Sequence, residues 1–222
     1  MKYSIVIPCY NEERSIGRVI ESLPRDIDEV IVVDNDSNDS TAKVARTYGA
    51  KVITEKKRGY GAAIKTGFKH ATGEIILTLD GDGQYPTEKV LEMISFLKSK
   101  NLDFVSASRF PIERRVMSAT RIFGNIMLTK IANVLFGLQL KDSQSGMWIF
   151  KRTVLATFDL KSDDMPISEE IKIRAATNGT LTFAEYHIPY HERVGISKLS
   201  PLRHGIKNLF FLFRLKYEQL TS

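Results

Sequence analysis

Two aspartates separated by one glycine carry the clearest chemical signal in this sequence. Asp80, Gly81 and Asp82 directly follow the apolar run 75–79, which has the character of a buried strand. Two carboxylates this close can share one hard divalent cation, Mg²⁺ or Mn²⁺, and leave coordination positions for the oxygens of a departing diphosphate. Asp and Gly are also common turn residues, so the tripeptide alone favours an exposed turn, and the surrounding motifs decide for the metal site.

A second acidic group follows another strand-like run, 29–33. A carboxylate at Asp34 or Asp36 can accept hydrogen bonds from a nucleobase or a ribose, whereas Asp39 or Ser40 can cap the next helix. Capping explains some of these residues but not all of them. This strand end is therefore a second candidate ligand site.

A basic segment with two glycines precedes the helical pattern at 62–70. It reads Lys57-Arg58-Gly59-Tyr60-Gly61, and such small residues and positive charges can cradle a phosphate at a helix N-terminus. Its spacing matches neither a P-loop nor a dinucleotide fingerprint. The segment predicts phosphate binding of another kind.

The first half of the chain predicts the scaffold that would bring these distant side chains together. Ile- and Val-rich runs alternate with segments whose apolar residues recur at helical spacing. The predicted strands are 4–7, 29–33, 51–54, 75–79 and 104–107, and the predicted helices are 13–23, 41–48, 62–70 and 88–98. Such a series forms an α/β, Rossmann-like, mostly parallel sheet sandwiched by helices, with ligands bound beyond the carboxyl ends of the strands.

The second half is less regular. It predicts helices at 119–136 and 169–177 and strands at 147–150 and 181–186, with no internal repeat and no linker. At 222 residues the chain is long enough for one domain with a full core. We therefore expect one catalytic domain at 1–200, followed by a C-terminal helix at 201–222.

The charge balance narrows the class of partner. The sequence has 32 Lys and Arg against 26 Asp and Glu, and the formal net charge of +6 indicates an anionic partner. Acidic lipid and a phosphorylated substrate both fit. Nucleic acid fits least, because the basic residues lack interleaved aromatics and the strand-end carboxylates would repel phosphate in the absence of a metal. The single cysteine excludes an intrachain disulfide, and the N-terminus lacks a signal-peptide pattern, so a cytoplasmic location is expected.

Six motifs occur in an order that resembles one enzyme family. They are Ile5-Val6-Ile7-Pro8-Cys9-Tyr10-Asn11-Glu12-Glu13, Val32-Val33-Asp34-Asn35-Asp36-Ser37, Gly59-Tyr60-Gly61-Ala62-Ala63, Asp80-Gly81-Asp82-Gly83-Gln84-Tyr85-Pro86, Ser108-Arg109-Phe110 and Asp142-Ser143-Gln144-Ser145-Gly146. Over nearly its whole length the chain resembles the inverting family-two glycosyltransferases, and among them the dolichol-phosphate mannose synthase-like polyprenyl-phosphate transferases. The resemblance implies an A-type glycosyltransferase fold. It also implies transfer of a hexose from a GDP-mannose or UDP-glucose type of donor to a polyprenyl phosphate, with inversion.

The resemblance implies where the donor binds. It assigns to the donor Pro8, Tyr10, Glu12, Asp34 and Asp36 around the nucleoside, Asp80, Asp82 and Gln84 at the metal and diphosphate, and Gly59. Asn35 departs from the Asp-Asp pair common in the family, which removes one carboxylate from the base-binding region. The choice between a guanine and a uracil donor therefore stays open.

The resemblance also implies a set of acceptor-phosphate ligands. They are Arg109, Arg121, Asn125, Arg193, Ser197 and Lys198. A lipid monophosphate carries nearly two negative charges at neutral pH, and bidentate arginines hold such a group well. Because the attacking oxygen is already ionised, positioning and charge stabilisation would dominate catalysis, with Asp82 and the three arginines as catalytic residues.

Two glutamates leave an alternative open. Glu169 and Glu170 lie near the position where relatives with hydroxyl acceptors keep a catalytic carboxylate. We include Glu169 among the candidate catalytic residues, as a general base, an orienting group or a helix N-terminal acid. A working base would favour transfer to a saccharide or protein hydroxyl. A third possibility is a non-catalytic scaffold that binds nucleotide sugars.

The segment 202–220 has the pattern of a basic amphipathic helix. Its apolar run 209–213 stops at Arg214, which is too short for a spanning helix of ~20 residues. With a polyprenyl substrate, we expect the helix to lie on the cytoplasmic face of a membrane. The alternatives are that its apolar face packs on the domain, on a second copy or on a membrane-anchoring partner.

Overall fold

The central feature of the computed structural model, which describes residues 1–195 and 201–221, is a seven-stranded sheet in the order β3-β2-β1-β4-β6-β5-β7. The strands are β1 (Tyr3–Cys9), β2 (Glu29–Asp34), β3 (Lys51–Thr54), β4 (Ile75–Thr78), β5 (Phe104–Ser108), β6 (Trp148–Lys151) and β7 (Phe183–His187). Neighbouring strands are parallel, except that β6 runs antiparallel to both β4 and β5. The predicted α/β, mostly parallel sheet is confirmed.

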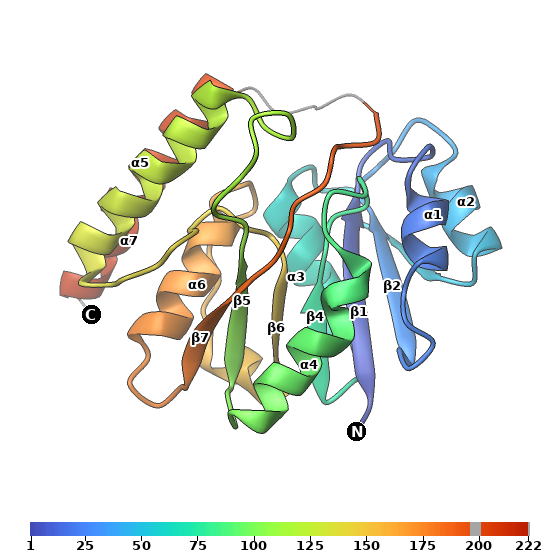
Figure 1. The fold of residues 1–222 in the computed structure, drawn as a ribbon, viewed down its shortest axis with the longest axis horizontal. Coiled ribbons are helices and arrows are strands. Elements are labelled where there is room, and N and C mark those ends of the chain that lie inside the picture. The colour runs from blue at the N-terminus through green and yellow to red at the C-terminus, as the bar shows by residue number, and fades with distance from the viewer. Residues whose placement is uncertain (196–200, 222) are drawn as a thin grey trace.

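Helices cover both faces of this sheet (Figure 1). They are α1 (Ile16–Glu21), α2 (Thr41–Thr47), α3 (Tyr60–His70), α4 (Val90–Ser99), α5 (Ala119–Phe136), α6 (Ile167–Thr177) and α7 (Pro201–Thr221), with short 3-10 helices at Thr87–Lys89 and Arg152–Thr157. The cores show that α1, α2 and α4 pack on one face and α3 and α6 on the other.

The alternation of side chains along the strands builds these two cores. In β1, Ile5 and Ile7 enter the core shared with α1 and α4, while Val6 between them enters the core shared with α3 and α6. In β4, Leu77 enters the first of these cores and Ile76 the second. Because both faces are buried, most positions of such a strand are apolar, which explains the Ile and Val runs in the sequence.

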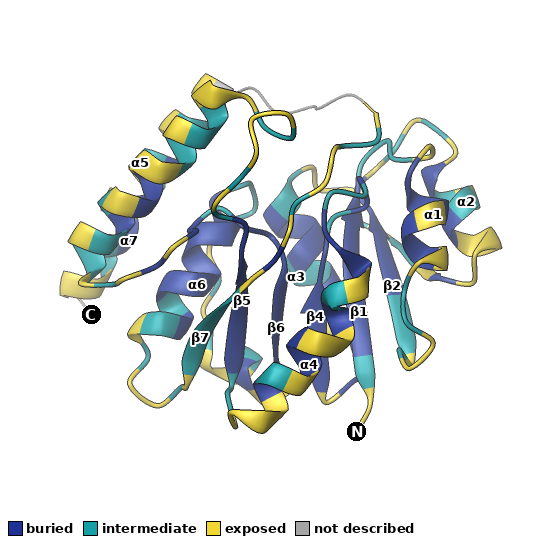
Figure 2. Ribbon diagram, in the orientation of Figure 1, coloured by how far each residue is buried: buried dark blue, intermediate teal, exposed yellow. Residues whose placement is uncertain are grey.

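The helices α5 and α7 lie side by side at one end of the molecule (Figure 1). A third small core joins them to α6, through Leu128 and Ala132 of α5, Ile173 of α6, and Leu212 and Leu215 of α7. Their outward sides are largely exposed (Figure 2). Within the described ranges, none of the helices is both long and apolar enough to cross a membrane.

The expected elements all occur, with shifts at their ends that have local causes. The helix predicted from residue 13 begins at Ile16, because a turn precedes it in which the N–H groups of Ser15 and Ile16 donate to the carbonyl of Glu12 (3.1 and 3.0 Å). The helix predicted from residue 169 begins at Ile167. This shift puts Glu169 inside the first turn of α6.

Candidate active site

The polar segments that follow β1, β2 and β4 meet at the carboxyl edge of the sheet, because these strands are parallel neighbours. Two other segments reach the same edge. Residues 142–146 do so because they precede the antiparallel β6. Residues 191–194 follow β7 and cross toward the ends of β4 and β1 (Figure 1).

Asp80 and Asp82 form the acidic centre of this edge. Asp82 is buried, and Asp80 accepts a hydrogen bond from the Tyr60 hydroxyl (2.9 Å). Burial, together with the neighbouring Asp82 charge, raises the pKa of the Asp80 carboxyl to about 7. Gly81 is required by packing, because a Cβ there would lie 2.4 Å from the sulfur of Cys9. The two carboxylates are thus held close together, and a bound cation would offset the repulsion between their charges.

Gln84 ties the Asp80–Gln84 loop to the segment after β7. Its backbone N–H donates to Asp82 Oδ1 (3.0 Å), and its side-chain amide donates to the carbonyl of His191 (3.1 Å). The N–H of His191 donates back to the carbonyl of Gln84 (2.9 Å). This reciprocal pairing holds residues 191–194 over the acidic centre.

Arg193 spans the acidic centre from that segment. Its two terminal guanidinium nitrogens donate to carboxylate oxygens of Asp82 and of Glu12. The next residue, Val194, donates its backbone N–H to the carbonyl of Asp82 (3.1 Å). The structure therefore brings Arg193, an expected acceptor ligand, into contact with two expected donor ligands.

The nucleoside side is built from the ends of β1 and β2. Asp34 is buried, and among the described residues no donor reaches its Oδ1 oxygen. A buried acceptor without a donor is costly, so a ligand N–H or O–H would stabilise this site. The Arg58 guanidinium lies over the Tyr10 ring (4.0 Å to its centre) and donates to Asp36 (3.2 Å). Pro8 lies buried within β1, beside Val33 of β2.

Asn35 holds the loop that leads into α3. Its side-chain amide donates to the carbonyls of Glu55 (2.9 Å) and Lys57 (2.8 Å), and its carbonyl accepts from the N–H of Gly59 (2.9 Å). An aspartate could not donate the first two bonds. The departure from the family's Asp-Asp pair therefore has a structural cause at this position.

The start of α3, where a phosphate cradle at Gly59 is expected, is packed closely against residues 162–163, and the cradle stays a prediction. A Cβ on Gly59 would lie 2.0 Å from the carbonyl oxygen of Asp163, and one on Gly61 would lie 2.5 Å from that of Ser162. The N–H of Gly59 is bonded to Asn35, and that of Ala62 to the carbonyl of Asp163 (3.0 Å). The glycines thus allow residues 162–163 to pack closely on the helix end. The N–H groups of Gly59 and Ala62 are already bonded within the protein.

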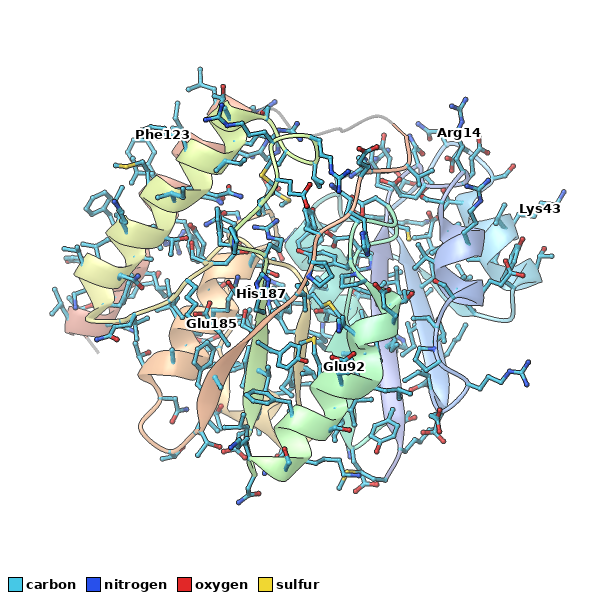
Figure 3. All side chains as sticks on the ribbon, viewed as in Figure 1. Arg14, Lys43, Glu92, Phe123, Glu185 and His187 are labelled. Atoms are coloured by element: carbon cyan, nitrogen blue, oxygen red, sulfur yellow. The ribbon has the colours of Figure 1, made fainter. Side chains whose placement is uncertain are left out.

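Arg109 is buried and committed to Asp142. Its Nε and a terminal nitrogen donate to the two oxygens of Asp142 (2.7 and 2.9 Å). Its guanidinium carbon lies over the ring of Tyr190, 5.1 Å from the ring centre. Burial alone would raise the pKa of Asp142, but the Arg109 charge outweighs it and the pKa is lowered. Glu185 of β7 (Figure 3) accepts from the N–H groups of Asp142 (3.1 Å) and Lys141 (2.6 Å). The role of Arg109 toward the acceptor stays a prediction.

Glu169 is fully buried in the first turn of α6. One of its oxygens accepts from the Gln144 side chain, and the other meets no donor among residues that the structure describes. Burial raises the pKa of Glu169 to about 8, so the carboxyl is protonated at neutral pH and is a poor general base. Of the three expected roles, the geometry favours an orienting group. Glu170 instead accepts from the N–H groups of Lys161 and Ser162 (both 2.8 Å).

The remaining acceptor residues are only partly placed. Arg121 and Asn125 lie one turn apart on α5, both half-buried, at the end of the helix nearer the carboxyl edge (Figure 1). The Asn125 amide donates to the sulfur of Met117 (3.7 Å). Ser197 and Lys198 lie outside the described residues.

Several residues of this edge carried no assigned role in the sequence analysis. Tyr60 binds Asp80, the Tyr85 hydroxyl accepts from the N–H of Gly146 (2.6 Å), and Asn208 of α7 donates to Gln144 (2.7 Å). Tyr60 and Tyr85 belong to quoted motifs, so the motifs could have suggested them. Asn208 lies in an amphipathic pattern that gives no sign of a polar inward contact.

The carboxylate oxygens of this edge suit a divalent ion that also keeps water and substrate oxygens as ligands. Within residues 1–195 and 201–221 there is no cluster of three or more His, Cys, Asp or Glu side chains that could enclose a metal. Asp80 and Asp82 could supply two oxygens, and phosphate and water would supply the others, as Mg²⁺ and Mn²⁺ allow. The residues present fit such an ion.

Comparison with known proteins agrees with this geometry. Residues 4–158 match the profile of "Glycosyl transferase family 2". A dolichyl-phosphate hexose transferase of Haloferax volcanii is 33% identical over 205 residues, covering 91% of this chain and 88% of the relative. A dolichol-phosphate mannosyltransferase of Pyrococcus furiosus is 30% identical over 193 residues, covering 78% of this chain and 53% of the relative.

A solved structure shares the fold. Glucosyl-3-phosphoglycerate synthase of Mycobacterium tuberculosis, crystallised with Mn²⁺, UDP-glucose and phosphoglyceric acid, superposes with a TM-score of 0.75 at 19% identity. The match covers 97% of this chain and 79% of that one. At this identity the likeness concerns the fold, which is the A-type glycosyltransferase fold. The matched profile over residues 4–158 and the 33% identical relative show that this chain belongs to glycosyl transferase family 2.

Proposed function

We propose that this chain transfers a hexose from a nucleoside diphosphate sugar to a polyprenyl phosphate, with inversion and with help from a divalent cation. The observation that carries the proposal is the contact of Arg193 with Asp82 and Glu12, which puts an anion-binding group against one expected cation ligand and one expected nucleoside ligand. The names of the two relatives support a polyprenyl phosphate acceptor and a hexose donor.

The donor binds along the strand ends. Asp34 accepts a hydrogen bond from the base, since its buried Oδ1 has no donor within the described chain. Tyr10 and Asp36, joined by Arg58, form the outer rim of the nucleoside site. Asp80 and Asp82 hold Mg²⁺ or Mn²⁺, and the bound ion neutralises the charge that develops on the leaving diphosphate.

The acceptor needs no protein base. A phosphate monoester oxygen is ionised at neutral pH and can attack the anomeric carbon directly. Glu169 fits this reaction as an orienting residue, because its buried carboxyl accepts a hydrogen bond from Gln144 and so holds the Asp142–Gly146 loop in place. The proposed phosphate ligands remain Arg109, Arg121, Asn125 and Arg193, with Ser197 and Lys198.

The helix α7 serves as the membrane contact in this proposal. Six exposed apolar residues repeat at three- and four-residue spacing along it: Leu202, Ile206, Phe210, Phe213, Tyr217 and Leu220. At 100° per residue they fall within a stripe of about 80° on one side of the helix. The exposed cations Arg203, Lys207 and Arg214 border this stripe. An apolar stripe with a basic border suits an anionic membrane surface, such as the cytoplasmic face where a polyprenyl phosphate is reached.

The reaction is tested by transfer of radiolabelled sugar. GDP- and UDP-sugars are offered with dolichyl or undecaprenyl phosphate and Mg²⁺, Mn²⁺ or EDTA. We expect labelled lipid with one donor class, and its loss in EDTA. Transfer to a saccharide or peptide acceptor in place of the lipid would show the hydroxyl-acceptor alternative. Nucleotide-sugar binding without transfer to any acceptor would show a scaffold.

The membrane contact is tested by co-sedimentation with vesicles that contain anionic lipid. Phe210→Ser removes one exposed ring from the stripe, and we expect about a tenfold weaker partition, because burying such a side chain contributes about 1.5–3 kcal/mol. Tyr48→Ser, at an aromatic residue exposed beyond α2, is the matched control. Equal partition of both variants and the parent would assign the stripe to a protein partner or a second copy.

A further inference from the structure

We propose that Arg193 is an internal counter-ion of the donor site, which a divalent cation displaces and so releases toward the acceptor phosphate. The inference rests on the proposed function, since it concerns the cation and the acceptor of that reaction. It assigns to one side chain the coupling between the two substrates.

The first argument is the occupation of the Asp82 oxygens. Oδ2 accepts from a terminal nitrogen of Arg193, and Oδ1 accepts from the backbone N–H of Gln84 (3.0 Å). A cation that binds Asp82 would share an oxygen with one of these donors, and at Oδ2 it would lie next to a second positive charge, the guanidinium. The N–H of Gln84 is part of a loop fixed by reciprocal bonds to His191, whereas a guanidinium can leave by rotation of its own side chain. Arg193 is the donor that can be exchanged.

The second argument is the charge of the surroundings. Arg193 is only 18% exposed, and its two partners Glu12 and Asp82 are 11% and 6% exposed. The other buried arginine of this edge, Arg109, is held by both oxygens of Asp142. Arg193 therefore supplies the positive charge that lies in direct contact with the acidic centre. A divalent ion placed there would repel it at short range.

The third argument is the unused donor of the guanidinium. The Nε–H of Arg193 is buried and, within the described part of the chain, meets no acceptor. A guanidinium binds a phosphate best through two parallel N–H groups, commonly Nε–H and a terminal N–H. In the contact of Arg193 with Glu12 and Asp82, the terminal nitrogens donate but Nε–H does not. A phosphate oxygen would satisfy both nitrogens.

The exchange predicts an order of events. While Arg193 is bonded to Glu12 and Asp82, it is withheld from the acceptor. Once the cation arrives with the nucleotide sugar, the guanidinium becomes available to the lipid phosphate. The acceptor phosphate is then bound by Arg193 only when the cation and the nucleotide sugar are already in place. This order couples acceptor binding to donor binding.

Direct binding of Mn²⁺ tests the exchange without a need for activity. Free Mn²⁺ is measured by electron paramagnetic resonance during titration of the full chain, the Arg193→Gln variant and the Glu12→Gln variant. We expect Arg193→Gln to bind Mn²⁺ about tenfold more tightly. Arg14→Gln is the control, since it removes the same charge at an exposed side chain that points away from the sheet (Figure 3). Its affinity should not change.

Glu12→Gln separates exchange from general electrostatics. Removal of a carboxylate lowers cation affinity if only the overall charge matters. If Arg193 competes for Asp82, loss of its second anchor weakens its hold, and Mn²⁺ should bind more tightly. Combining both substitutions should then add nothing beyond Arg193→Gln.

The outcomes are distinct. Equal Mn²⁺ affinity in the parent and in Arg193→Gln would overturn the exchange, as would weaker binding by Glu12→Gln, and neither result would affect the sugar-transfer assay. Failure of every protein to bind Mn²⁺ would overturn the exchange together with the proposed metal site. Circular dichroism melting curves confirm that each variant is folded.

Discussion

The donor side and the acceptor side of this active site are prepared for their ligands in opposite ways. On the donor side, Asp34 keeps a buried oxygen without a donor in the described chain, and Asn35 fixes the neighbouring loop. On the acceptor side, the arginines are already paired: Arg109 with Asp142, and Arg193 with two carboxylates. In the proposed reaction, a nucleoside would therefore meet an acceptor oxygen that has no protein donor among the described residues, whereas an acceptor phosphate would have to compete with carboxylates of the protein itself.

The largest expected effect would show whether Arg109 is structural. Asp142→Ala leaves a buried guanidinium without its carboxylate, which should cost about 3–5 kcal/mol of unfolding free energy. Urea denaturation measures it. Asp163→Ala is the control, because its pairs with Lys57 and Lys65 are partly exposed and should be worth about 1 kcal/mol or less. If both variants lose equally little, Arg109 is available to phosphate and the contrast between the two sides weakens.

The next effect concerns the acidic centre. Asp80→Asn keeps the size of the side chain but removes its charge, so we expect sugar transfer to fall by about 10²–10³-fold through lost charge stabilisation. The folded state should not be less stable, since burial already raises the pKa of Asp80 to about 7. Initial rates and melting curves check both parts. Asp26→Asn, at an exposed aspartate, should match the parent in each.

The pH dependence of stability sharpens the contrast at Glu169. Its pKa is raised to about 8 in the folded chain from an ordinary value of 4.5, so between these pH values the unfolded chain releases a proton that the folded chain retains. Stability therefore falls as pH rises through this window, by at most about 1.4 kcal/mol per pH unit. Glu169→Gln should remove that slope.

Urea titrations of parent and variant below pH 7 measure this slope. Lys172 complicates higher pH, because burial lowers its pKa to about 7 and stability rises with pH above that value. An unchanged slope in Glu169→Gln would show that the carboxyl is already ionised, and would return it to consideration as a base.

The smallest effect tests the donor side. Asn35→Asp replaces two amide donations by contacts between a carboxylate and the carbonyls of Glu55 and Lys57, and should cost about 1–3 kcal/mol. Nucleotide affinity should fall with it, because the same loop carries Arg58. Nucleotide titration calorimetry and urea denaturation measure the two effects. Asn38→Asp, an exposed neighbour, should change neither.

The sequence predicted the place of the acidic strand ends better than that of the segment 142–146, for physical reasons. Asp34, Asp80 and Asp82 each follow a parallel strand, so the strand pattern alone places them at one edge. The segment 142–146 reaches that edge only because β6 runs antiparallel, and its pattern does not show the direction of a strand. The packing of Gly59 on Asp163 could not be predicted, because glycine looks the same in a phosphate cradle and in a tight packing contact.

The contact between Asn208 and Gln144 bears on protein engineering. A helix with six exposed apolar residues is an obvious target for deletion when a chain is hard to keep in solution. Yet α7 also seals the core beside Leu128 and donates a hydrogen bond into the loop next to Asp80. Trimming it would open that core and leave Gln144 without a donor. Replacing outward-facing residues such as Phe210 is the safer route to a well-behaved sample.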